Sequence, residues 1–111
     1  MAFTTETTVN DDVTTITLAG ELDGKVAPEF REAIDTSTSS ATKRLVLMMN
    51  DLEYIASAGL RVLIFAKQKL GDGVSIIVVG AQEQVQDTLE KTGFNRSVYL
   101  VDSYDASAPL G

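Results

Sequence analysis

Residues 44–70 read RLVLMMNDLEYIASAGLRVLIFAKQKL, and this stretch predicts a strand followed by a helix. Residues 45–49 are apolar without polar alternation, which is typical of a strand covered on both faces. Asn50 and Asp51 favour turns, so we expect the strand to end there. Ser57 comes just before a long apolar run, where a serine is a favoured helix N-cap.

The predicted helix has one apolar face and one mixed face. The arc expected to face the core contains Gly59, Leu60, Leu63, Ala66 and Leu70, with Val62 and Ile64 beside it. The opposite face carries Ala58, Arg61, Phe65 and Lys69. An exposed phenylalanine beside an arginine is compatible with a partner surface, but single exposed apolar residues are also common on soluble proteins. Both interpretations stay open.

Ser57 also allows two interpretations. It is either only a helix cap or a position for a regulatory phosphate. A phosphate there would lie beside unpaired backbone amides and the positive end of the helix dipole. It would add about −1.5 to −2 charges at neutral pH, enough to disturb a partner docked over that spot.

Composition excludes several classes of function. The chain has 111 residues, no Cys and no His, which removes thiol nucleophiles, imidazole catalysis and ordinary zinc sites. It contains no glycine-rich phosphate-binding motif. A net charge of −7 argues against nucleic acid as a partner. We therefore expect neither an enzyme nor a bound cofactor or metal.

Hydropathy predicts a protein without membrane insertion. No stretch approaches the ~20 apolar residues of a transmembrane helix, and the N-terminal residues lack the basic and apolar regions of a signal peptide. The absence of Cys fits a reducing compartment. We expect a cytoplasmic location.

The chain before the central stretch predicts a β-hairpin and a short helix. Residues 3–9 are rich in β-branched threonine, residues 10–12 form a turn cluster, and residues 13–19 partly alternate. Residues 20–24 are expected to break the second strand. Pro28 suits the first turn of the helix that follows.

The chain after the central stretch predicts a strand over residues 74–79, a helix over residues 82–91 and a last strand over residues 98–101. Residues 102–111 are expected to form a short helical turn or a tail. The order is therefore strand, strand, helix, strand, helix, strand, helix, strand. This order favours one α/β domain over residues 1–111, with a mixed sheet of about five strands.

Three segments resemble a known family. Gly20-Glu21-Leu22-Asp23 matches a turn of the STAS domain, the fold of bacterial anti-sigma factor antagonists. Residues 52–63, LEYIASAGLRVL, resemble the family's signature at the start of its second helix. Residues 91–94, KTGF, resemble the end of its third helix. The resemblance spans about residues 13–101 and implies the STAS fold.

The resemblance also implies a mechanism and its partners. In such proteins an ATP-dependent anti-sigma kinase phosphorylates the signature serine, and a PP2C-type phosphatase removes the phosphate. The unphosphorylated form binds the anti-sigma factor and frees the sigma factor. The serine at that position is Ser57. The resemblance implies that Asp23 and the signature residues Ala56, Ser57, Ala58 and Gly59 contact the partner. The positions of Arg61, Val62 and Phe65 on the predicted helix add these three residues to the expected partner-binding set.

Two residues depart from the family pattern, and other functions stay open. Ala56 replaces the usual Asp before the phosphoacceptor, and Met48 replaces an Asp or Asn of the preceding strand. Asp23 is either a partner contact or a turn and capping residue. The alternative functions are a STAS module in another partner-switching or sensing pathway and a non-switched STAS subunit of a lipid-transport ATPase complex. A small nucleotide-binding or hydrolytic domain fits least, because the chain lacks His and a phosphate loop.

Overall fold

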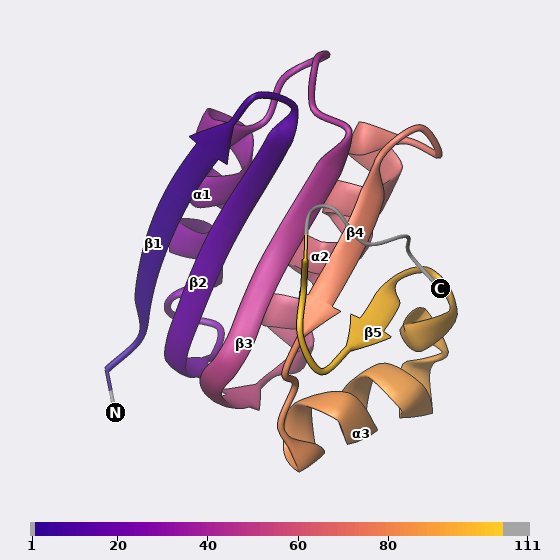
Figure 1. Ribbon diagram of the computed structural model, residues 1–111. Helices are drawn as coiled ribbons and strands as arrows, with labels where there is room; N and C mark the ends of the chain where they lie inside the picture. The colour runs from indigo at the N-terminus through magenta and orange to yellow at the C-terminus, as the bar shows by residue number, and fades with distance from the viewer. Residues whose placement is uncertain (1, 106–111) are drawn as a thin grey trace.

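The computed structural model describes residues 2–105, which form one five-stranded sheet with three α-helices (Figure 1). The elements in chain order are β1 (Thr4–Asn10), β2 (Val13–Leu22), α1 (Ala27–Ser37), β3 (Arg44–Ile55), α2 (Ser57–Leu70), β4 (Ser75–Val79), α3 (Glu83–Thr92), the short 3-10 helix η1 (Phe94–Arg96) and β5 (Tyr99–Val101). The predicted order of strands and helices is confirmed. Residues 102–105 form no helix, and residues 106–111 of the predicted turn or tail lie outside the described residues.

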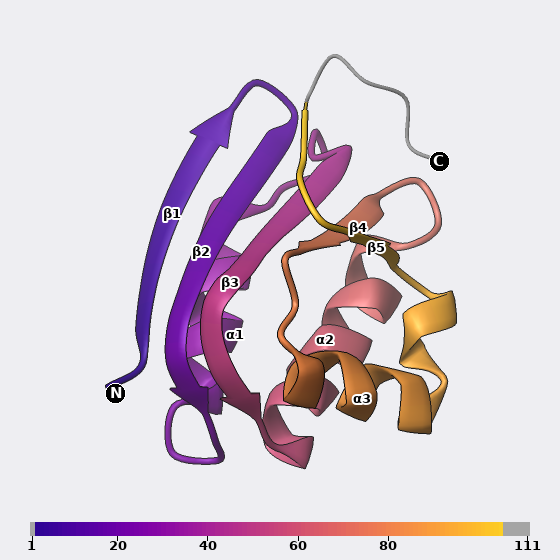
Figure 2. The same ribbon diagram turned by 60° about the horizontal axis from the view of Figure 1, so that its bottom comes forward.

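The sheet is mixed, with the strands side by side in sequence order, β1-β2-β3-β4-β5. β1 and β2 form the predicted antiparallel hairpin, and every later pair of neighbours is parallel. α1 and α2 lie side by side on one face of the sheet (Figures 1 and 2). α3 packs at the end of the sheet where β3 and β4 finish.

The core lies between the sheet and the helices. Alternate residues of β2 are buried, as expected for a strand with one face on the core. β3 is buried on both faces at its start, as the apolar run of residues 45–49 predicts. The largest fully buried side chains include Phe30, Ile16, Leu18, Leu22, Leu47, Leu52 and Leu63. Their burial holds β2, β3, α1 and α2 as one body.

The opposite face of the sheet carries a second, smaller apolar cluster. Val46, Ile77 and Val79 are buried there, and Tyr104 packs against them. The Arg44 guanidinium donates a hydrogen bond of 2.9 Å to the Tyr104 hydroxyl. The residues that follow β5 therefore cover part of the sheet face without helices.

Two strand ends differ from the prediction. β3 continues past Asn50 and Asp51 to Ile55, and β2 continues through residues 20–22. Both extensions arise because β2 and β3 stay paired, with Leu22 opposite Ile55, across register shifts that absorb the turn-forming residues. The longer strands bring the β2–α1 loop to the start of α2.

Candidate functional site

The candidate site is the first turn of α2. Ser57 is the first residue of the helix and is exposed. The N-cap is Ala56, whose backbone is extended and whose carbonyl accepts the Leu60 amide at 3.1 Å. The prediction that Ser57 caps the helix is therefore wrong by one position, because the extended residue that precedes the helix is Ala56. Among the described residues, no hydrogen bond involves the Ser57 hydroxyl.

The β2–α1 loop lies against this turn. The Ala56 amide donates to the Leu22 carbonyl at 2.9 Å, and a Cβ added to Gly24 would lie 3.9 Å from the Ala58 Cβ. The Asp23 carboxylate accepts the Lys25 amide at 2.9 Å and the Val26 amide at 3.3 Å. Asp23 therefore orders its own loop, next to the segment that carries Ser57, and a further role in partner contact stays a prediction.

Gly59 fixes how closely α2 approaches the sheet. A Cβ at this position would lie 2.6 Å from Leu22 Cγ and 3.0 Å from Ile55 Cγ1. Leu22 and Ile55 are themselves buried, so a methyl group at Gly59 would force one of these side chains or α2 itself to shift. Gly59 is buried, and Val62 is only 8% exposed within the core. Neither residue offers a side chain for a partner to cover in this conformation.

The outer face of α2 presents a small mixed surface. Arg61 and Phe65 are both exposed, one turn apart. The guanidinium of Arg31, from α1, lies 4.0 Å from the centre of the Phe65 ring. Such cation–π stacking holds an exposed ring in one orientation. The sequence alone did not predict this role of Arg31, because the Phe65 ring that it contacts is on another helix.

Gln84 of α3 supports the segment ahead of Ser57. Its side-chain amide accepts the Ile55 amide at 3.0 Å and donates to the Ile55 carbonyl at 3.3 Å. Gln82 donates to the Asn50 carbonyl at 2.8 Å. β4 pairs with β3 only as far as Met48. The side chains of Gln82 and Gln84 therefore bind backbone groups of β3 beyond the end of this pairing. A glutamine on a helix gives no sequence signal for this role.

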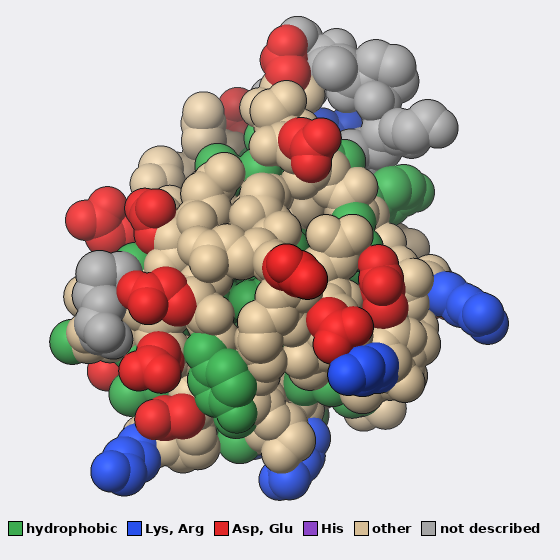
Figure 3. Space-filling view, turned by 90° about the horizontal axis from the view of Figure 1, so that it is seen from below, with side chains coloured by type: hydrophobic (Ala, Val, Ile, Leu, Met, Phe, Trp, Pro, Cys, Tyr) green, Lys and Arg blue, Asp and Glu red, His purple; other side chains and the backbone are tan. Residues whose placement is uncertain are grey.

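The end of the molecule that carries this site is acidic. Figure 3 views it from below and shows Asp and Glu side chains spread over the surface, with Lys and Arg mostly toward the rim. An acidic surface disfavours the phosphate backbone of a nucleic acid. Among residues 2–105, no group of His, Cys, Asp or Glu is arranged to hold a metal ion, and no helix is long and apolar enough to cross a membrane.

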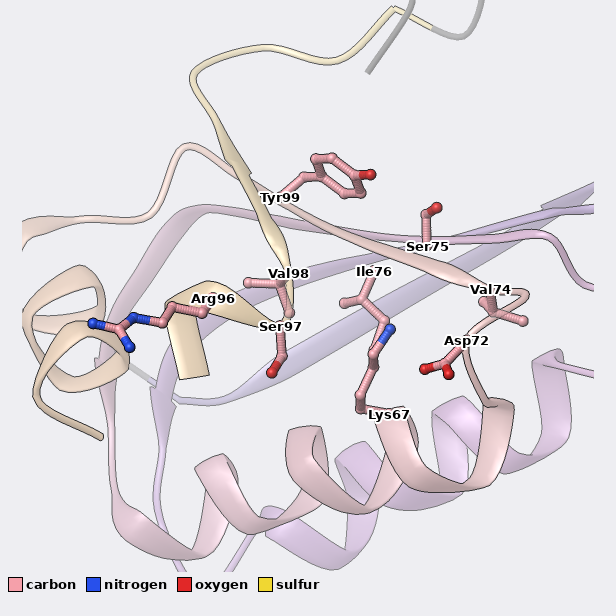
Figure 4. A pocket seen from close by; sticks show the side chains of 9 residues that line it. All are labelled: Lys67, Asp72, Val74, Ser75, Ile76, Arg96, Ser97, Val98 and Tyr99. Atoms are coloured by element: carbon pink, nitrogen blue, oxygen red, sulfur yellow. The ribbon is translucent and has the colours of Figure 1, made fainter. Parts of the chain in front are cut away.

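A separate cleft of about 470 Å³ lies between the C-terminal half of α2, β4 and β5 (Figure 4). The Lys67 amine points into it, whereas the Arg96 guanidinium points away. Lys67 is ten residues after Ser57, about 15 Å along the helix. The cleft shares no residue with the predicted site.

Comparison with known proteins decides the family. The sequence model of the STAS domain family matches residues 4–107 of the chain. The chain belongs to the STAS family. No curated protein sequence matches it significantly.

The solved structures that resemble this STAS domain include three informative relatives. An anti-sigma factor antagonist from Mycobacterium paratuberculosis shares 26% identity, with a TM-score of 0.84 over 94% of this chain and 89% of that one. The anti-sigma factor antagonist SpoIIAA in its unphosphorylated form shares 22% identity, with a TM-score of 0.71 over 93% and 90% of the two chains. The STAS domain of a SulP transporter from Vibrio cholerae shares 19% identity, with a TM-score of 0.66 over 87% and 78%. The similarity to SpoIIAA and to the SulP STAS domain shows that the fold is shared.

Proposed function

We propose that this STAS domain is a phosphorylation-switched antagonist of an anti-sigma factor. In the unphosphorylated state it binds an anti-sigma factor that is also an ATP-dependent serine kinase, and the sigma factor is released. Phosphorylation of Ser57 ends that binding, and a PP2C-type phosphatase restores it. The observation that carries the proposal is the exposed Ser57 hydroxyl, which has no hydrogen bond within residues 2–105 and stands at a helix N-terminus.

The likeness to an anti-sigma factor antagonist at 26% identity supports this choice among STAS functions. The acidic end of the domain and the absence of His and Cys favour a protein partner over nucleic acid or catalysis. The proposed exchange of partners takes place in the cytoplasm.

The position of Ser57 explains how a phosphate would change binding and leave the fold intact. The first turn of α2 has no acidic residue, so its free amides and dipole can accept a negative charge. A partner docked over Ser57 would have to desolvate the phosphate or leave it unpaired, and both are costly. A loss of about 4 kcal/mol in binding is roughly a thousandfold in affinity.

The proposed contact surface surrounds Ser57. Its members are Asp23, Ala56, Ala58, Arg61 and Phe65, with Arg31 supporting the Phe65 ring. Gly59 and Val62 serve this surface through packing, since both are buried. The partner is therefore expected to cover one helix turn, the neighbouring loop and the outer face of α2.

The test compares three variants of the full chain as bait in lysate of the source cell. Ser57→Ala mimics the unphosphorylated state, and Ser57→Asp adds a charge at the same place. Ser40→Asp is the matched control, because Ser40 is exposed in the loop at the opposite end of the sheet (Figure 1). Bound proteins are identified by mass spectrometry, and phosphate on the wild-type chain is mapped after incubation with ATP.

We expect an ATPase-fold serine kinase on the Ser57→Ala and Ser40→Asp baits, its loss from Ser57→Asp, and phosphate on Ser57. A transport ATPase held equally by all three baits would refute the switch and identify a constitutive STAS subunit. A kinase that is held and released as expected, but controls no sigma factor, would place the domain in another partner-switching pathway.

A further inference from the structure

The outer edge of β1 is open along the whole strand among the described residues. β1 is the first strand in the sheet order and pairs only with β2 among the described strands. Of its residues, only Thr5 is partly buried, and the others are exposed. At the other edge, β5 contributes only three residues. An open strand of this length offers unpaired backbone amides and carbonyls to another chain.

β1 also lacks the features that usually protect such an edge. It contains no Lys, Arg or Pro, and Glu6 is its one charged residue. Four threonines and Val9 give it a high strand propensity. Its pairing with β2 is continuous from Thr4 to Asn10, without a bulge to twist the edge away. Val9 is 57% exposed, which is high for a large apolar residue.

The hairpin register determines which backbone groups face outward. A two-residue turn at Asp11 and Asp12 joins Asn10 to Val13, so this closing pair is hydrogen-bonded. Hydrogen-bonded and non-hydrogen-bonded pairs alternate along an antiparallel ladder. The backbone amides and carbonyls of Thr5, Thr7 and Val9 therefore face the open edge.

We propose that β1 pairs antiparallel with β1 of a second copy of this chain, with Thr7 opposite Thr7 of that copy. This register pairs Thr5 with Val9 and forms roughly six backbone hydrogen bonds. It matches all of β1, since Thr4 then lies opposite Asn10. Glu6 lies opposite Thr8, so the one charged side chain of the strand never faces its own copy.

The charge of Glu6 selects this register over its neighbours. A shift that places Glu6 opposite Glu6 brings two like charges directly together, which is destabilising. A shift the other way, with Thr8 opposite Thr8, leaves Thr4 and Thr5 without partners. The strand is thus self-complementary in one full-length register, which favours a second copy over an unrelated strand.

The dimer is expected to be weak, and it leaves the Ser57 site open. Pairing of single edge strands buries less surface than the roughly 1,200–2,000 Å² of stable interfaces. β2 separates β1 from β3, the strand that leads to Ser57 (Figure 1). The inference is therefore independent of the proposed function.

Sedimentation velocity over a range of concentrations tests whether the dimer uses β1. The wild-type chain should pass from monomer to dimer as concentration rises. Thr7→Pro removes an outward amide and should weaken association at least tenfold, while circular dichroism confirms the fold. Thr7→Val is the matched control, because it keeps the backbone donor and should associate like wild type. A monomer at every concentration, or an unweakened Thr7→Pro dimer, would overturn the proposal.

Cysteine cross-linking tests the register, since the chain has no cysteine of its own. A mixture of Glu6→Cys and Thr8→Cys chains should form a mixed disulfide under mild oxidation, because these positions face each other in the proposed pair. Glu6→Cys chains alone should cross-link much less. Preferential cross-linking of Glu6→Cys to itself would reject this register.

Discussion

The two faces of α2 differ in what they tolerate. On the inner face, Leu60, Leu63 and Ala66 are at most 5% exposed, and Gly59 leaves no space for even one methyl group. On the outer face, Ser57, Arg61 and Phe65 are exposed. The inner face fixes the helix on the sheet, so the outer face is free to change charge or partner. This separation is what a binding switch requires of its scaffold.

The largest effect is expected from Leu63→Ala. Leu63 is fully buried, and deletion of a buried leucine side chain costs about 2–5 kcal/mol through lost transfer energy and the cavity left behind. The adjacent Ile64→Ala is the control, because Ile64 is 37% exposed and should cost less than about 1 kcal/mol. Urea unfolding followed by circular dichroism measures both. Equal losses would mean that the two faces of α2 do not differ in the way described.

A smaller loss is expected from Gly59→Ala. Overpacking costs about 1–3 kcal/mol, and the better helix propensity of alanine offsets about 1 kcal/mol of that cost. The clash is with Leu22, so Gly59→Ala should cost less in a Leu22→Ala background than in wild type. A double-mutant cycle measures this coupling free energy. A neutral or stabilising Gly59→Ala would show that α2 can move away from the sheet.

The order of the elements was predictable because apolar periodicity reports burial. The apolar run of residues 45–49 and the helical spacing of Gly59, Leu60, Leu63 and Ala66 correspond to the buried parts of β3 and α2. The strand ends were not predictable in the same way. Asn50 and Asp51 favour turns locally, but pairing with β2 and the bonds from Gln82 and Gln84 keep β3 extended.

The candidate site was predictable only in part, for a similar reason. The position of Ser57 at a helix start follows from local sequence, since an apolar helical run begins just after it. The support of its segment by Gln84 and the stacking of Arg31 on Phe65 depend on contacts between distant elements. Val62 lies within the core cluster, although its position on the helix only places it beside the apolar arc.

The smallest effect on stability is expected from Ser57→Asp. The substitution adds a charge at the first helical position, where no acidic residue is present in the first turn, and a carboxylate near a helix N-terminus contributes about 0.3–1 kcal/mol of stability. Ser57 has no hydrogen bond within residues 2–105 to lose, so the free energy of unfolding should stay within about 0.5 kcal/mol of wild type or rise slightly. Thermal unfolding beside Ser40→Asp, which carries the same charge away from any α-helix N-terminus, separates the helix effect from net charge. If Ser57→Asp alone lowered the free energy of unfolding by more than about 1 kcal/mol, a negative charge at this position would destabilise the fold. Phosphorylation would then act on folding as well as on binding.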